Sequence, residues 1–343
     1  MKAWQLMDTQ GIGSFSLNEI DEPVPGPGQV RIKIARSALN HLDLWVAQGL
    51  PAPKHLPHTT GADGTGWVDA VGEGVSGFEG GDEVIIDPSL ACGDCPACRN
   101  DDIVYCDGFQ ILGEHSPGTL TEKIVVPVIN AVRKPSALSW DVAGSFGLAT
   151  ATALRMLERT SVKPEQTVLI VGVGGGVSAA AMELALAMRA RVFVTSRSED
   201  KIAWAISEGA EAGFDSASDF GSQMTALGGA DVVVDNVGAA TMRQSMRAAK
   251  KGGRIAICGA TSGPKLELTV PHLFFRQLEM IGSSMANHAQ FARATTWVST
   301  GGASSPVSRV FDFDDVPEAL AYLESGAQVG KVVIKVTDDQ PSA

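Results

Sequence analysis

The sequence predicts an α/β protein of two domains, in which a β-rich domain encloses a doubly wound domain built on a parallel sheet. Three observations support this prediction. The chain has 343 residues, about twice the length of a typical single domain. Short strands and Gly/Pro turns fill roughly the first 130 residues, and apolar strands alternate with helices from about residue 134. Short strands return after about residue 286, so we expect the second domain to be inserted into the first.

The β-rich domain is assigned to residues 1–130 and 286–343. Its clearest strand follows the turn cluster PVPGPGQ, where Val30, Ile32 and Ile34 alternate with charged residues. This period of two is typical of a half-buried strand. Further strands punctuated by glycine are expected at residues 66–68 and 82–86.

The doubly wound domain is assigned to residues 131–285. Its strands are continuous apolar runs, which is typical of a parallel sheet covered by helices on both faces. The expected strands are 167–171, 192–195, 231–235 and 254–258, and the expected helices are 179–188, 199–207 and 240–249.

A glycine-rich turn, VGVGGGVSAAA, follows the strand 167–171 and opens a helix. Of its two overlapping registers, only Gly174-x-Gly176-x-x-Ala179 satisfies the G-x-G-x-x-G/A pattern of dinucleotide-binding turns, because the other ends at a valine. Glycines allow the backbone to approach a pyrophosphate, and the helix N-terminus supplies free N–H groups. We therefore predict a dinucleotide site at Gly172, Gly174, Gly175, Gly176 and Val177.

The end of the second strand of this domain predicts which nicotinamide cofactor binds. An acid here would accept hydrogen bonds from the adenosine ribose, but the chain has Ser196, Arg197 and, one turn later, Lys201. A hydroxyl and a guanidinium suit a 2′-phosphate, so NADPH is predicted over NADH. The alternative is that Arg197 and Lys201 belong to the solvated face of a helix.

Four cysteines within residues 90–107 follow the spacing C-x2-C-x2-C-x7-C, namely Cys92, Cys95, Cys98 and Cys106. This spacing can place four thiolates around one tetrahedral zinc. The alternative is two disulfides, but the first twenty residues contain no secretory signal pattern. We predict one structural Zn²⁺ and a cytoplasmic protein.

The loop CGDCPACRNDDIVYC resembles the structural-zinc lobe of the medium-chain dehydrogenase/reductase superfamily, which contains zinc alcohol dehydrogenases and quinone oxidoreductases. The resemblance spans essentially the whole chain. It implies a GroES-like β-rich catalytic domain, a Rossmann domain and an active-site cleft between them. It also implies that Lys331 reaches the pyrophosphate. It further implies nicotinamide-half contacts from Thr152, Asn236, Gly259, Ala260, Gly282 and Ser283.

The same resemblance implies that a catalytic zinc is absent. Where zinc-dependent members carry the three ligands, this chain has Asn40, Ala62 and Leu148, none of which is a zinc ligand. Without the metal, hydride is expected to go to a conjugated carbonyl acceptor such as a quinone, an enone or a 2-alkenal. The candidate catalytic residues are Asn40, His41, Asp43 and Asp63, although each also has a structural interpretation in a turn, a cap or a domain seam.

Two other functions stay open at this stage. One is an alcohol or aldehyde dehydrogenase that uses a metal bound by unrecognised ligands. The other is a non-catalytic NADPH-binding protein, which would bind the cofactor without turning over any acceptor.

The net charge and the lack of long apolar runs disfavour some classes of binding partner. The formal net charge is −12, which disfavours binding to nucleic acid or to an anionic membrane surface. No apolar run approaches the roughly 20 residues that span a bilayer. We expect a small-molecule substrate, no nucleic-acid or membrane partner, and a homodimer or homotetramer.

Overall fold

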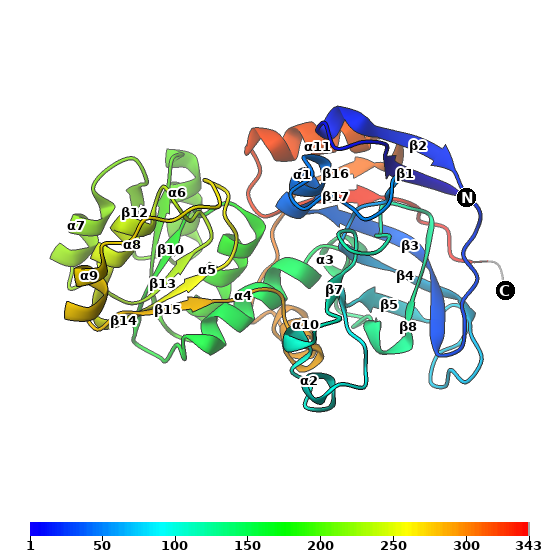
Figure 1. The fold of residues 1–343 in the computed structure, drawn as a ribbon, viewed down its shortest axis with the longest axis horizontal. Helices are drawn as coiled ribbons and strands as arrows, with labels where there is room; N and C mark the ends of the chain where they lie inside the picture. The colour runs from blue at the N-terminus through cyan, green and yellow to red at the C-terminus, as the bar shows by residue number, and fades with distance from the viewer. Residues whose placement is uncertain (342–343) are drawn as a thin grey trace. The chain divides into compact units, whose positions relative to one another are not determined.

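A computed structural model describes residues 1–341, which form two compact units (Figure 1). The β-rich unit contains residues 1–148, 286–299 and 305–341, and the parallel-sheet unit contains residues 149–285 and 300–304.

The β-rich unit is built on a seven-stranded sheet in the order β16-β17-β3-β4-β5-β9, with β8 also paired to β3. All pairs are antiparallel except β16 with β17. The bounds are β3 (Gln29–Leu39), β4 (Asp63–Val71), β5 (Glu83–Ile86), β8 (Lys123–Pro127), β9 (Ala131–Arg133), β16 (Val307–Asp312) and β17 (Lys331–Lys335). The unit also holds β1 (Lys2–Leu6), β2 (Phe15–Glu19), α1 (His41–Ala47) and α3 (Trp140–Ala143).

Strand β3 shows why the sequence folds this way. Val30, Ile32 and Ile34 are fully buried in one apolar cluster, so burial of an apolar face drives the pairing. Ile34 lies opposite Gly66 of β4. A Cβ at Gly66 would lie 1.9 Å from the Lys33 carbonyl oxygen, so only glycine permits this close approach of the two strands.

The C-terminal tail differs from the expected run of short strands. It contains two helices, α10 (His288–Ser299) and α11 (Val316–Ser325), besides β16 and β17. Val316 and Leu320 of α11 are fully buried in a cluster with Trp4 and Leu6. The apolar residues of α11 lie three and four positions apart, the spacing of one face of a helix.

The parallel-sheet unit has six strands in the order β12-β11-β10-β13-β14-β15, all parallel. Counted within the unit this order is 3-2-1-4-5-6, the order of dinucleotide-binding domains. The strands are β10 (Thr167–Val171), β11 (Arg191–Ser196), β12 (Ala212–Asp215), β13 (Ala230–Asp235), β14 (Ala249–Ile257) and β15 (Glu279–Gly282). The helices are α4 (Gly147–Arg159), whose first two residues belong to the β-rich unit, α5 (Gly176–Ala187), α6 (Glu199–Ser207), α7 (Phe220–Ala226), α8 (Met242–Ala248) and α9 (Val270–Phe275).

The boundary between the units lies later than residue 131. Strand β9 hydrogen-bonds to β5, with Val132 opposite Ile85, and therefore belongs to the β-rich sheet. The following residues to Leu148 stay with that unit. Among residues 1–341, no helix is both long and apolar enough to cross a membrane.

Candidate functional site

The glycine turn begins directly after β10. Gly172 and Gly174 have φ values of 77° and 119°, a region that favours glycine, and α5 begins at Gly176 with Gly175 as its N-cap. The two glycines with positive φ are the first two of the register Gly172-x-Gly174-x-x-Val177. In the register predicted from the sequence, Gly174-x-Gly176-x-x-Ala179, the second glycine is the first residue of α5.

Lys201 lies against this turn. A Cβ at Gly174 would come within 2.5 Å of the Lys201 Cδ, so the glycine makes room for the lysine chain. Burial, followed by repulsion from Arg197, lowers the pKa of Lys201. Arg197 is exposed at the end of β11, and Ser196 beside it is buried. Two neighbouring cations and a hydroxyl at this strand end form a suitable site for a phosphate.

The remaining predicted cofactor residues of this unit follow the carboxyl ends of its strands. Asn236 follows β13, Gly259 and Ala260 follow β14 after one residue, and Ser283 follows Gly282, the last residue of β15. Since all the strands are parallel, these positions share one edge of the sheet, where open α/β sheets bind their ligands. Thr152 lies on α4 and is buried.

Two observations show that this edge fits a dinucleotide. The Ser283 Oγ is buried and has no hydrogen-bond partner among the described residues, which leaves it available to a ligand. No side chain caps the N-terminus of α5, so its amides can receive a phosphate. Sequence analysis missed Ser178, whose hydroxyl donates to the Gly172 carbonyl at 2.9 Å and lies 3.1 Å from Asn236 Nδ2. Its only signal was a polar residue in the first turn after the glycines.

A buried polar cluster lies in the β-rich unit, around the carboxylate of Asp63. Asp63 Oδ1 accepts from Leu148 N at 2.6 Å. Asp63 Oδ2 accepts from Asn40 Nδ2 at 3.0 Å and from Lys331 Nζ at 2.8 Å. Asp63 and Lys331 are 1% and 3% exposed, so this is a fully buried ion pair. Asn40, Asp63 and Lys331 are called the Asp63 cluster below.

Lys331 therefore binds Asp63, whereas the family resemblance implies that it reaches the pyrophosphate. Besides Asp63, its ammonium donates to Leu39 O at 2.9 Å and to Asn40 Oδ1. These three acceptors use all three of its hydrogens. Reaching a pyrophosphate would break a buried ion pair, and we assign Lys331 to the cluster instead.

The other two predicted catalytic residues, Asp43 and His41, have different surroundings. Asp43 accepts from Asn40 N at 2.7 Å and from Gly61 N at 2.8 Å, and burial raises its pKa. Its oxygens therefore hold together the segments that carry Asn40 and Asp63. His41 is half-buried, and its ring meets that of Trp45 edge-on with centroids 6.2 Å apart.

The three positions at which the family resemblance implies that zinc ligands are missing all lie in this unit. Asn40 is bound within the Asp63 cluster, Ala62 is buried, and Leu148 meets Asp63 only through its backbone amide. Across residues 1–341, the four cysteines make the sole group of three or more His, Cys, Asp or Glu side chains able to hold a metal ion.

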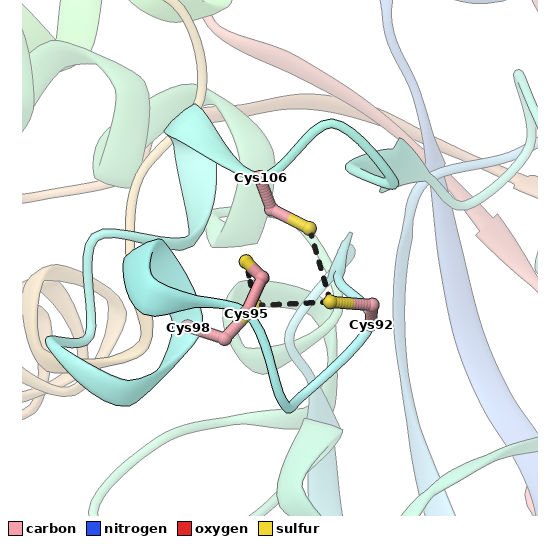
Figure 2. Close-up of side chains that lie close together, drawn as sticks. All are labelled: Cys92, Cys95, Cys98 and Cys106. Atoms are coloured by element: carbon pink, nitrogen blue, oxygen red, sulfur yellow. Dashed lines mark hydrogen bonds between the residues drawn. The ribbon is translucent and has the colours of Figure 1, made fainter.

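The four cysteines point toward one another from the lobe between β6 (Ser89–Leu90) and β7 (Gln110–Ile111), which includes α2 (Pro96–Arg99) (Figure 2). Neighbouring sulfurs lie 3.5 to 3.7 Å apart, well beyond the roughly 2.05 Å of a disulfide. A tetrahedral zinc with Zn–S bonds of about 2.3 Å separates its sulfurs by roughly 3.8 Å. Gly108 N also donates to Cys106 Sγ at 3.3 Å, as expected for a thiolate. The lobe fits one structural zinc.

Two histidines of the β-rich unit make contacts that the sequence does not indicate. His58 lies in a Pro-rich loop and is nevertheless buried, and its Nε2 lies 3.0 Å from the Gly113 carbonyl oxygen. His288 Nδ1 lies 2.7 Å from Asp87 Oδ2, and this long-range pair fixes the start of α10. No local pattern could have predicted it, because the two residues are 201 positions apart.

Comparison with known proteins identifies two domain families in this chain. Residues 26–136 match the alcohol dehydrogenase GroES-like domain, and residues 176–300 match the zinc-binding dehydrogenase domain. A zinc-type alcohol dehydrogenase-like protein of Schizosaccharomyces pombe is 32% identical over 90% of this chain and 91% of its own length.

Two solved structures are similar over nearly the whole chain. An NAD-dependent alcohol dehydrogenase is 39% identical with a TM-score of 0.94, covering 98% of this chain and 100% of its own. A crotonyl-CoA carboxylase/reductase in complex with NADP is 25% identical with a TM-score of 0.91, covering 98% of this chain and 95% of its own.

The zinc lobe yields a test. Cys98→Ser replaces a thiolate by a much weaker ligand, so zinc should fall from one per chain to well below one. Stability should fall by more than about 2 kcal/mol, because binding of a structural zinc contributes to folding. Elemental analysis and thermal unfolding measure the two effects.

The matched control is Cys258→Ser, since Cys258 lies outside the lobe and should leave the zinc content unchanged. Two zincs per chain in the unmodified protein, or an unchanged zinc content in the Cys98 variant, would contradict this assignment.

Proposed function

Because this chain belongs to the medium-chain dehydrogenase/reductase superfamily, we propose that it is an NADPH-dependent reductase of conjugated carbonyl acceptors that works without a catalytic zinc. The acceptor is a quinone, an enone, a 2-alkenal or an enoyl thioester. The observation that carries this proposal is the Asp63 cluster, where a lysine ammonium and an asparagine amide stand in the neighbourhood of the replaced zinc ligands. A metal ion there would be repelled by the ammonium and would find no free carboxylate.

The missing Lewis acid decides the class of acceptor. Hydride addition to a simple ketone or aldehyde places the full negative charge on one oxygen, which a zinc would stabilise. A conjugated acceptor takes the hydride at its electron-poor carbon and spreads the charge onto the carbonyl oxygen, where hydrogen-bond donors suffice. A proton then completes the reduction.

The residues of the β-rich unit supply such donors. NADPH, when bound, supplies the hydride. The Asn40 amide and the His41 ring are the proposed donors to the acceptor oxygen, as their place beside the replaced ligand position indicates. Lys331 neutralises Asp63, so no uncompensated carboxylate opposes the charge that develops on the acceptor.

The names of the similar proteins support the oxidoreductase class but differ in the acceptor that they indicate. The crotonyl-CoA carboxylase/reductase is named for a conjugated thioester and was solved with NADP. The NAD-dependent alcohol dehydrogenase, with its higher identity, favours a second candidate, oxidation of an alcohol. That reaction would require a second metal site in this chain, or another electrophile in its place.

The choice of acceptor is tested by turnover. With NADPH, reduction should be measurable for at least one quinone, enone, 2-alkenal or enoyl thioester. Acetaldehyde with NADPH, and ethanol with NADP⁺, should react at least roughly a hundredfold more slowly, because one oxygen must then carry the charge unaided.

Steady-state absorbance at the NADPH band measures these rates, with and without a chelator that should not inhibit. Fast, chelator-sensitive oxidation of ethanol would instead establish the alcohol dehydrogenase. Tight NADPH binding without turnover of any acceptor would leave a non-catalytic binding protein.

The cofactor preference is tested at Arg197. The unmodified protein should bind NADPH more tightly than NADH by roughly 1 to 3 kcal/mol, the range for charge-assisted hydrogen bonds. Arg197→Ala should remove most of that difference and leave NADH affinity nearly unchanged. Fluorescence titration at fixed ionic strength measures both affinities.

Arg189→Ala is the control, since Arg189 is an exposed arginine paired with Glu165 at the opposite end of β11. Equal affinities for the two cofactors in the unmodified protein would show that Arg197 and Lys201 are only solvated.

We also propose that the chain forms a homo-oligomer through the segment 266–275 and strand β15. Five large apolar side chains are exposed in this segment: Leu266, Leu268, Val270, Phe274 and Phe275. Among the described strands β15 pairs only with β14, so its outer edge can accept another strand. A second copy of the chain would cover both features.

Phe275 is 72% exposed, and Phe275→Glu should reduce the oligomer to monomers by placing a charge in the apolar contact. Sedimentation velocity measures the mass. Val24→Glu, at an 82% exposed position of the β-rich unit, should leave the oligomer intact. A monomeric unmodified protein would refute the proposal.

A further inference from the structure

The Asp63 cluster constrains the orientation of one amide group. Asn40 begins α1 as its N-cap and is only 8% exposed. Its Oδ1 faces the Lys331 ammonium, and its Nδ2 faces Asp63 Oδ2 at 3.0 Å. An ammonium has only donors and an ionised carboxylate has only acceptors. The two partners therefore distinguish the two ends of the amide.

Turning the amide over would cost both contacts. The NH2 group would then face the ammonium and the carbonyl would face the carboxylate, so two charge-assisted hydrogen bonds would become repulsive pairs. The two charged partners are themselves fixed, because Asp63 Oδ1 is held by Leu148 N and Lys331 Nζ also donates to Leu39 O. The amide plane is thus held from both sides by buried groups.

One hydrogen of this amide is left over. Nδ2 carries two hydrogens, and Asp63 accepts one of them. In residues 1–341, no side chain or carbonyl accepts the other. Donation from Lys331 to Oδ1 also polarises the amide, which strengthens its N–H groups as donors.

Resting on the proposed function, we propose that Lys331 and Asp63 are positioning residues that hold Asn40 with one N–H ready for the acceptor's carbonyl oxygen. Lys331 does not touch the acceptor. Its ammonium acts through the Asn40 amide, which donates to the oxygen as negative charge develops on it. A preorganised donor of this kind stabilises the transition state more than the bound acceptor.

The kinetic test removes the pair together. Asp63→Asn with Lys331→Met leaves no unpaired buried charge, whereas either change alone would. The new amide at position 63 must turn its oxygen to Leu148 N, so it presents NH2 to Asn40 and no longer fixes it. With a conjugated acceptor, kcat should fall roughly tenfold to a hundredfold. The KM for the acceptor and the Kd for NADPH should change little.

A double-mutant cycle separates positioning from a structural role. Asn40→Ala should lower kcat at least as much as the paired change does. Adding the paired change to Asn40→Ala should then lower kcat by less than about twofold, because groups that act through one another are not additive. Fully additive losses would overturn the proposal.

The control for the loss of an ion pair elsewhere in the same sheet is Arg36→Met. Arg36 lies on β3, like Leu39, and pairs with Asp141 and Asp338 at 2.6 and 2.7 Å. This variant should lower thermal stability and leave kcat unchanged. A fall in kcat equal to that of the paired variant would show that loss of an ion pair elsewhere in the sheet has the same effect, and would overturn the proposal.

A second measurement does not depend on turnover or on the folding of the paired variant. The side-chain amide of Asn40, identified in the ¹⁵N spectrum by its loss in Asn40→Ala, should show two distinct protons. One should be protected from exchange by Asp63, and the other should shift when a conjugated acceptor is added. Equal exchange rates for the two protons would overturn the fixed orientation. If no acceptor is reduced, the proposed function fails, and this spectrum still decides the orientation.

Discussion

The buried carboxylate of Asp63 is the interaction on which this account depends. It joins three places far apart in the sequence: Asn40 at the start of α1, Leu148 at the start of α4, and Lys331 at the start of β17. Because the carboxylate and the ammonium are both buried, neither can lose its partner without leaving an isolated charge, which costs about 3 to 5 kcal/mol. The arrangement of the segments that begin α1, α4 and β17 is therefore fixed by charge pairing.

The same pairing sets the chemistry that this region can support. The ion pair is neutral overall, and its lysine has no hydrogen left to donate to a ligand. The polar group that remains is the Asn40 amide. An amide can stabilise a delocalised negative charge, but it stabilises a charge concentrated on one oxygen much less than a divalent metal ion would. Binding of the dinucleotide is the other requirement, and the parallel-sheet unit has the features for it. Its glycine turn admits a pyrophosphate, and two cations, Arg197 and Lys201, lie near the end of β11.

Much of the fold could be predicted from the sequence because its signals are local. Alternation in Val30 to Ile34, continuous apolar strands and the glycine turn each lie within a few residues, and the cysteine spacing constrains a lobe by itself. Contacts between residues far apart in the sequence could not be predicted in this way. Lys331 meets Asp63 across 268 positions, and residues 131–148 join the β-rich unit because β9 pairs with β5. His58 contacts the Gly113 carbonyl, 55 positions away, and the Pro-rich sequence around His58 does not indicate this contact.

The central claim is that an ammonium, and not a metal ion, occupies the region of the replaced ligands. The most direct test is a crystal structure of the protein grown with zinc present, with anomalous differences measured at the zinc absorption edge. We predict one anomalous peak per chain, within the four cysteines, and an uninterrupted contact from Lys331 Nζ to Asp63 Oδ2. A second peak beside Asn40 and Asp63, with the Lys331 side chain displaced, would contradict the account.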